Sequence, residues 1–352
     1  MAKQIGVQRD WQNKLTGCQY VFAGMNNIID PTNLDLETGK VVDGINVDFD
    51  NTNSANTRTG YTRRFAGTFH SGWNNDTKTL AYMVKDGWIY EFDGTAAPYA
   101  LIPVTTNDRM EFCQVNDVIA YSNGTDFGVI GGVNNQRGLY SPEFKQATIG
   151  GRCLEFFNGK LYFARSNNLY CTDTFDVEHV DVRFSHVATF QHTITMCKRV
   201  EDGIWVGTEK YVYFLNKIKT YIGEDNGFAQ VIVAKAGVVY GTAGKTNAEY
   251  VPEAGNTNNV VIFLTTSGIC SGGNGSKYTN HSFNEMSFDV GTSGTATIKT
   301  DHGISQYIVC VNMDSGYEYN PYSYDIPTSV DTIDYAVWSL IIPKVDVNFR
   351  AT

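Results

Sequence analysis

A short β-hairpin pattern recurs along this chain, and its spacing limits the possible folds more than any other feature. Each copy is a β-prone run, a polar turn and a second β-prone run, and several turns are Asp-Gly, Asn-Gly or Ser-Gly. The copies lie at residues 80–94, 117–132, 159–173, 202–216, 260–273 and 306–320. The second runs, centred on Tyr90, Val129, Tyr170 and Tyr213, follow one another at intervals of 39, 41 and 43 residues. Because a four-stranded propeller blade takes roughly 40–50 residues, this rhythm predicts a β-propeller.

Three of the hairpins follow another β-prone run, at residues 108–115, 150–157 and 192–200, and we expect these runs to be inner strands of successive blades. After Tyr213 the intervals widen to 56 and 50 residues, with second runs near Ile269 and Tyr319. An additional segment at 228–255 reads as a broken blade or an insertion. The predicted class is therefore all-β, a β-propeller of about six blade-like units.

The two ends of the chain do not follow the repeat, so we expect three parts. Residues 1–65 form closing strands or a small β side domain, and residues 66–330 form the propeller with the irregular stretch at 220–258. Residues 331–352 supply a closing C-terminal strand. Residues 41–65 read as a strand, a long polar loop and a strand. The one helix expected lies around residues 9–17.

Composition narrows the classes of protein. The chain is globular, with 42% hydrophobic and 18% charged residues, and its net charge of −10 does not suit a basic nucleic-acid groove. Seven scattered cysteines without a CxxC pair favour a reducing compartment during folding. The N-terminus shows no apolar h-region, so no signal peptide is expected. The sequence has no run of about 18 apolar residues, so no membrane span is expected.

Motifs that carry chemistry are incomplete. The stretch GTAGKT at 241–246 resembles a phosphate loop, but the loop would need a glycine where Val239 stands. The stretch DFDNTN at 48–53 alternates oxygen ligands as a calcium loop does, but Asn53 and Thr59 occupy the positions of its glycine and glutamate. The six histidines show no ligand spacing. We therefore predict no catalytic residue, no cofactor-binding residue, no metal ligand, no cofactor and no enzyme activity.

Two stretches resemble a known group of proteins. Residues 44–73, GINVDFDNTNSANTRTGYTRRFAGTFHSGW, resemble the opening of β-propeller virion proteins of tailed phages, in which a line of the N-V-D … R-R-x-G-Y type precedes a first blade beginning near H-S-x-W. Residues 150–183 and 194–215 are similar to their middle blade and the blade after it, including the G-x-x-V-G-T turn. The resemblance covers about residues 44–215, and its motifs are structural.

The resemblance implies a tail component, of the nozzle or hub type found in short-tailed phages. Such a protein would form a homo-oligomeric ring, six-fold by analogy, and extend the DNA channel. It would dock to portal or adaptor proteins and to tail fibres or spikes. DNA would pass through without specific binding, and an acidic ring would repel it. The expected location is the virion, assembled in the host cytoplasm.

Two rival functions remain open from the sequence. One is a glycan-binding or receptor-binding propeller, with Trp73, Trp88 and Trp205 as candidate stacking residues on one rim. The other is a propeller enzyme such as a glycosidase, which would need a cluster of three or more acidic or histidine side chains in the channel. The basic and aromatic stretch RTGYTRRF at 58–65 is a candidate nucleic-acid or subunit contact.

Overall fold

A computed structural model of the chain describes part of the sequence residue by residue. The described residues are 67–75, 77, 79–94, 97–131, 144–217, 228–247, 251, 259–282, 291–301 and 304–312, together with strand segments at 8–9, 15–16, 24–25, 40–41, 47–49, 55–57 and 335–342. Strands and turns make up this part of the chain, and its only helical element is a short 3-10 segment at Asn274–Ser276. The predicted all-β class is confirmed.

The chain divides into two compact units, which we describe separately. The middle unit comprises Thr62–Gly241 and Asn274–Ser276. The terminal unit comprises Met1–Tyr61, Thr242–Gly273 and Lys277–Thr352. The three parts expected from the sequence, with boundaries after residues 65 and 330, stay a prediction.

Four sheets follow one another along the middle unit, and neighbouring strands in each sheet run antiparallel. In sequence order their strands are β7 (His70–Asn74), β8 (Ala81–Lys85), β9 (Trp88–Phe92) and β10 (Tyr99–Pro103); β11 (Glu111–Val115), β12 (Val118–Ser122) and β13 (Phe127–Ile130); β15 (Arg152–Phe157), β16 (Lys160–Arg165), β17 (Asn168–Cys171) and β19 (His186–Thr189); and β20 (Ile194–Arg199), β21 (Gly203–Thr208), β22 (Val212–Lys217) and β23 (Phe228–Ala234).

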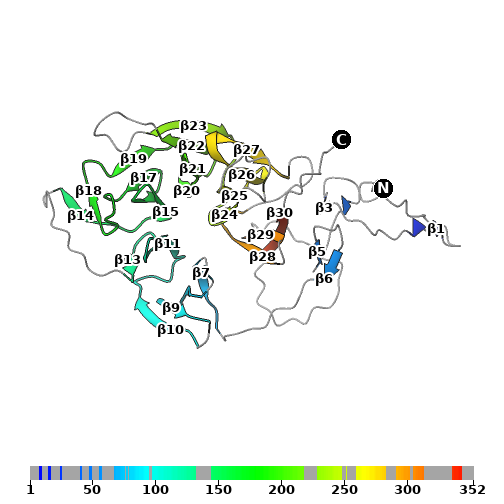
Figure 1. The fold of residues 1–352 in the computed structure, drawn as a ribbon, viewed down its shortest axis with the longest axis horizontal. Helices are drawn as coiled ribbons and strands as arrows, with labels where there is room; N and C mark the ends of the chain where they lie inside the picture. The colour runs from blue at the N-terminus through cyan, green and yellow to red at the C-terminus, as the bar shows by residue number, and fades with distance from the viewer. Residues whose placement is uncertain are drawn as a thin grey trace. The chain divides into compact units, whose positions relative to one another are not determined.

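The first strand of each sheet faces the inside of an arc, and the last strand lies at its outside (Figure 1). On the inner side β7 contacts β11, β11 contacts β15 and β15 contacts β20. Antiparallel sheets that meander outward from adjacent first strands are the blades of a β-propeller. The fold class is therefore a β-propeller, and the three predicted inner strands are confirmed as β11, β15 and β20. The count of about six blades stays a prediction.

Tight turns explain why the hairpins form where the sequence places them. Asp86–Gly87 joins β8 to β9, and Asn158–Gly159 joins β15 to β16. All four residues have positive φ, at 49° and 74° in the first turn and 49° and 78° in the second. A two-residue hairpin turn of this type needs positive φ at both positions, which Asp, Asn and Gly adopt most readily. The turns fix the register, with Lys85 opposite Trp88 and Phe157 opposite Lys160.

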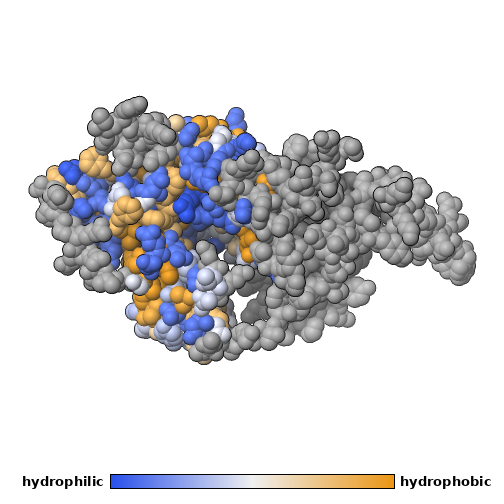
Figure 2. All heavy atoms as spheres, in the orientation of Figure 1, coloured by the Kyte–Doolittle hydropathy of each residue, from blue (hydrophilic) through white to orange (hydrophobic). Residues whose placement is uncertain are grey.

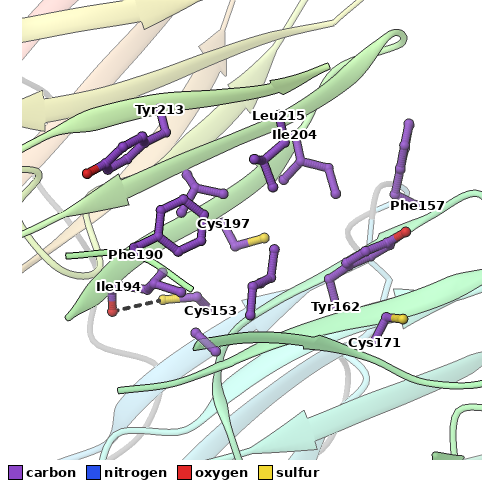
Figure 3. Packing of buried hydrophobic residues seen from close by; sticks show 13 residues of the cluster. Cys153, Phe157, Tyr162, Cys171, Phe190, Ile194, Cys197, Ile204, Tyr213 and Leu215 are labelled. Atoms are coloured by element: carbon purple, nitrogen blue, oxygen red, sulfur yellow. Dashed lines mark hydrogen bonds between the residues drawn. The ribbon is translucent and has the colours of Figure 1, made fainter. Parts of the chain in front are cut away.

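The best-packed core lies between two neighbouring blades (Figure 3). Its members come from the blade that begins with β15 and the blade that begins with β20, and they include Tyr162, Ile204, Tyr213 and Leu215. Phe190, in the connection between the two blades, packs its ring against Tyr213 with centroids 4.9 Å apart. Burial of apolar area, at about 25 cal/mol per Å², stabilises the packing of one blade on the next.

Four of the six cysteines that the structure describes are buried: Cys153, Cys171, Cys197 and Cys270. The first three belong to the core in Figure 3, where the thiol of Cys153 lies 4.0 Å from the carbonyl oxygen of Ile194. Burial raises the pKa of the Cys153 and Cys270 thiols, so both are protonated at neutral pH and unreactive. These side chains act as small apolar groups, as their neighbours in the sequence predict. Cys18 lies outside the described residues.

A two-stranded sheet departs from the blade pattern of the middle unit. It pairs β14 (Lys145–Ala147), which precedes the blade that starts at β15, with β18 (His179–Asp181), which lies between β17 and β19. We call residues 144–149 and 173–184 the arm. The arm differs from the single blade expected over residues 150–183, because β18 leaves the blade to pair with β14.

The terminal unit holds two larger sheets. One contains β24 (Gly244–Thr246), β25 (Val260–Thr265), β26 (Gly268–Gly272) and β27 (Tyr278–Asn280), and the other contains β28 (Gly294–Asp301), β29 (Ile304–Asn312) and β30 (Tyr335–Ile342). Short strand pairs in the N-terminal part are β1 (Gln8–Arg9) with β2 (Leu15–Thr16), β3 (Gly24–Met25) with β4 (Lys40–Val41), and β5 (Val47–Phe49) with β6 (Ala55–Thr57). The last pair fits the strand, loop and strand expected between residues 41 and 65.

Two local expectations are wrong. The helix expected around residues 9–17 is replaced by antiparallel pairing of β1 with β2, in which Arg9 faces Leu15. The hairpin expected to turn at 314–316 does not pair β29 with a strand near Tyr319, because β28 and β30 occupy both edges of β29. The turn itself lies outside the described residues. The β-prone residues and the Ser-Gly pair favoured pairing of β29 with the nearby run around Tyr319. The structure pairs it instead with β30, which lies farther along the chain.

The irregular segment at 228–255 is divided between two sheets. Phe228–Ala234 is β23, the fourth strand of the blade that starts at β20, and Gly244–Thr246 is β24, the first strand of the next sheet. The phosphate-loop resemblance at 241–246 is thus a turn with Gly241 at φ 83° followed by a strand, which is the interpretation that the sequence favoured.

Candidate functional site

The arm exposes more large apolar side chains than any other described part of the chain. Phe175 is 65% exposed and Phe184 is 62% exposed, and Ile149 and Val182 are exposed to 44% and 45%. Scattered apolar residues are normal on a surface, but these four lie in the segments that flank one small sheet, and exposed apolar groups of this kind are candidates for an interaction site. The arm is therefore our first candidate functional site.

Charged pairs hold the arm in shape. Arg183 donates to both carboxylate oxygens of Asp181, at 3.0 and 2.7 Å, and these hydrogen bonds lower the pKa of that carboxyl. The same guanidinium lies 4.1 Å from the ring centroid of Phe144 and 5.2 Å from that of Phe184. Lys145 pairs with Asp173 at 2.7 Å, and the hydrogen bond raises the pKa of the lysine. Such stacking and pairing pre-organise the aromatic side chains.

The base of the arm is joined firmly to its blade. Val177 and Val180 are buried in a core with Leu161 and Phe163 of β16. The amide of Phe175 donates to the carbonyl of Gly159 at 2.6 Å. The arm therefore presents its exposed side chains on a rigid base, which reduces the entropy that binding would cost.

Charged residues also gather on the inner strands of the middle unit. Glu111 of β11 accepts hydrogen bonds from the Tyr240 hydroxyl at 2.6 Å and from the Leu154 amide at 3.0 Å. Arg109 and Arg152 lie over the Tyr240 ring, 5.0 and 5.6 Å from its centroid. Burial, and then the charge of Glu111, raises the pKa of Tyr240, so its hydroxyl stays a donor. This group ties the third blade to the second.

A second carboxylate on the inner strands is nearly inaccessible. Glu155 of β15 is 2% exposed and lies 3.6 Å from Lys198 and 3.5 Å from Arg199, both on β20. Desolvation alone lowers the pKa of Lys198, but the charges of Glu155 and Glu111 outweigh it, so this pKa is raised. The lysine therefore keeps its charge. Glu155 links two adjacent blades through charge.

The geometry of these two carboxylates suits structure better than acid–base chemistry. Each is engaged by donors or cations of its own chain, and none of the described residues forms a group of three or more His, Cys, Asp or Glu side chains that could hold a metal. A channel cluster of three or more acidic or histidine side chains would have favoured a propeller enzyme. The charged side chains of this region are two glutamates, Glu111 and Glu155, and four cations, Arg109, Arg152, Lys198 and Arg199.

The three tryptophans proposed for glycan stacking do not share one exposed rim. Trp205 is fully buried on β21 and packs against Phe214, so its assignment as a stacking residue is wrong. Its place between apolar strand residues of a blade core explains the error. Trp73 is partly buried and stacks on Tyr82, and Trp88 is 40% exposed.

Other sequence candidates fall at or beyond the edge of the described residues. In the calcium-like stretch 48–53, Asp48 and Phe49 lie in β5 and the rest is outside the described part. The basic stretch 58–65 also lies outside it. In the described part of the chain, no helix is long and apolar enough to cross a membrane.

Comparison with known proteins gives similarity in solved structures and not in sequence. No protein-family model matches the chain, and no curated protein matches it. The WD40 β-propeller domain of Doa1 is 11% identical, with a TM-score of 0.43, over 69% of this chain and 75% of that one. A computationally designed protein, Ika8, is 9% identical, with a TM-score of 0.39, over 68% and 67% of the two chains.

The extracellular domain of a B. thetaiotaomicron protein is 12% identical, with a TM-score of 0.41, over 73% of this chain. The match covers only 33% of the B. thetaiotaomicron chain, so this chain spans about a third of its length. The scores and identities are low, so the assignment of this chain to the β-propeller class depends on the strand order of its blades.

Proposed function

We propose that this chain is a non-enzymatic structural protein of a phage tail, a nozzle or hub subunit that docks to adaptor and to fibre or spike proteins. The observation that carries the proposal is the arm, in which exposed Phe175 and Phe184 project from a rigid blade. A structural subunit needs firm scaffolding and outward contact residues, and loops on rigid propellers serve that purpose. The resemblance of residues 44–215 to propeller virion proteins supports the same role.

The charge of the chain fits a channel subunit. A net charge of −10 per copy would make a ring strongly acidic, and like charge keeps DNA from adhering. In this proposal copies form a homo-oligomeric ring, six-fold by resemblance, and the genome slides through without specific binding.

The direct test is the protein content of particles of the phage that encodes this chain. We expect quantitative mass spectrometry of purified virions to find the chain in a fixed, small number of copies, and gold-labelled antibody to mark the tail. Virions that lack the chain, or carry it on the capsid shell, would refute the proposal. Phe175→Ala with Phe184→Ala should give particles without the components that attach to the arm. Tyr99→Ala, at a 52% exposed site on β10 outside the arm, is the control.

The two rival functions have less support. Of the three tryptophans proposed for glycan stacking, Trp205 is buried, and only Trp73 and Trp88 remain as candidates. A glycan array with the full chain would test this function. A glycosidase-like activity would require Glu111 and Glu155 as acid and base, although Tyr240, Lys198 and Arg199 already engage them. Hydrolysis of surface polysaccharide that is lost in Glu155→Gln but retained in Glu209→Gln would support it.

A further inference from the structure

The outermost strand of the blade that starts at β20 is chemically unlike a protected edge. β23 has the sequence FAQVIVA, seven residues without a charge or a proline, and among the described strands only β22 pairs with it. Val231 is 45% exposed and Ile232 is 52% exposed. Apolar side chains reach the surface where β23 lies (Figure 2, in the orientation of Figure 1). An edge strand with open backbone groups and no charge is a template for another strand.

The outermost strands of the other three blades of the middle unit are shorter than β23, and some are interrupted. β10 contains a bulge between Ala100 and Ile102 and ends at Pro103. β13 and β19 have four residues each, and the pairing of β19 with β17 contains a register shift. Short strands, bulges and prolines are the ways in which natural sheets block edge-to-edge pairing. Among the outermost strands of these four blades β23 is the longest, with seven residues; the edge strands β28 and β30 of the terminal unit have eight residues each.

The regular part of β23 is long enough to accept a partner. A bulge at Val233 interrupts its pairing with β22, since Tyr213 faces Ile232 while Val212 faces Ala234. Phe228–Ile232 is thus an unbroken stretch of five residues. At about 3.4 Å per residue it offers roughly 17 Å of edge.

We propose that this edge pairs antiparallel with the same strand of a second copy of the chain, about a two-fold axis at Gln230. Phe228 would then face the partner's Ile232, and Ala229 would face the partner's Val231. Gln230 would meet the partner's Gln230, and the two exposed amides can exchange hydrogen bonds. The contact is isologous and closed, so it satisfies both copies at once.

Charge selects this arrangement. Lys235 directly follows β23 and is exposed. In antiparallel pairing the two copies of Lys235 lie at opposite ends of the contact, whereas parallel pairing would place them side by side. The uncharged stretch itself adds no repulsion between two acidic chains. A second copy therefore fits the edge without any compensating residue from another protein.

The inference goes beyond the tail role, because a two-fold contact pairs chains and does not by itself close a ring. Its test is the mass of the assembly in solution by sedimentation equilibrium. For the wild-type chain we expect an even number of 39.1 kDa copies. Val231→Lys with Ile232→Lys should halve that mass, because charge on an edge strand blocks pairing. Tyr99→Lys is the matched control, since Tyr99 is also exposed, at 52%, but lies on β10, an edge strand interrupted by a bulge.

A cross-link gives an independent readout. Gln230→Cys should form an intermolecular disulfide within minutes under mild oxidation, since directly opposed residues of antiparallel strands have Cα atoms about 4.5–5.5 Å apart. Tyr99→Cys, at an exposed position on β10, should form little or none. A monomeric wild-type chain, an unchanged mass in the double lysine variant, or equal cross-linking of the two cysteine variants would overturn the two-fold contact. The presence of the chain in virions tests the tail role separately.

Discussion

The inner strands and the outer parts of the middle unit distribute polarity in opposite ways. Inside, Glu155 of β15 is 2% exposed and finds Lys198 and Arg199 on the next blade. Outside, Phe184 on the arm and Ile232 on β23 are more than half exposed. The buried charge is compensated within the chain, and the exposed apolar groups are not. The comparison shows that the inner charges find their partners when the chain folds. The exposed apolar side chains on the outside have surface left to bury against another molecule.

The largest expected effect concerns the interior. Trp205→Ala should lower the free energy of unfolding by about 3–5 kcal/mol, because it removes a fully buried ring from a packed blade. Urea unfolding followed by circular dichroism measures it. Trp88→Ala, at a 40% exposed site, should cost about 1 kcal/mol or less. Equal losses in both variants would erase the distinction between buried and rim tryptophans.

The charge link between blades comes next. Glu155→Ala should lower the free energy of unfolding by about 3 kcal/mol, the low end for breaking a buried ion pair, because the partly exposed Lys198 and Arg199 can rehydrate. The exposed Glu209→Ala should stay within about 0.5 kcal/mol of wild type. A loss as small as that of the control would mean that the inner charges contribute nothing to blade packing.

A smaller effect depends on pH. Tyr240→Phe removes the hydrogen bond to Glu111 and should cost about 1.5 kcal/mol near pH 7. Burial raises the pKa of Tyr240, so the fold favours its neutral form. That stabilisation is present below the ordinary pKa of about 10 and is lost as pH rises above it, when the unfolded tyrosine ionises.

Unfolding midpoints at pH 8 to 11 therefore test the assignment, with both proteins measured in the same buffers. The advantage of wild type over Tyr240→Phe should shrink above about pH 10. Parallel pH profiles of the two proteins would contradict a hydroxyl that stays protonated in the fold.

The smallest effect on stability is expected at the arm. Phe184→Ala should change the free energy of unfolding by no more than about 0.5 kcal/mol, since the ring is 62% exposed. The amount of attached component per particle should nevertheless fall severalfold. A large loss of stability with normal attachment would make Phe184 a structural residue and remove it from the candidate docking site.

Much of the blade architecture could be predicted because it depends on local chemistry. Asp86–Gly87 and Asn158–Gly159 need no distant partner to turn the chain, so their hairpins follow from the sequence. Pairings that close over long distances could not be predicted in this way. The arm is one, since Lys145 of β14 faces Asp181 of β18 with three blade strands between them, and the sheet of β29 with β30 is another.

The candidate site was also missed for a physical reason. Phe175 and Phe184 lie in a turn-rich stretch, and the sequence does not tell an exposed aromatic residue from a core residue at the edge of a strand. Trp205 shows the opposite error, as an aromatic residue judged available for binding lies in the core. Two phenylalanines among acidic and turn residues, DTFDVEHVDVRF, were the available signal of the arm.

The arm has a consequence for the order in which the chain folds. β14 and β18 meet only after the chain between them has returned, and that chain contains β15, β16 and β17. Closing such a loop is entropically costly until the intervening strands are already compact. We therefore expect the arm to form late in folding, after strands β15, β16 and β17 of the blade have paired. Hydrogen exchange should show the amides of β14 and β18 opening more often than those of the blade they enclose.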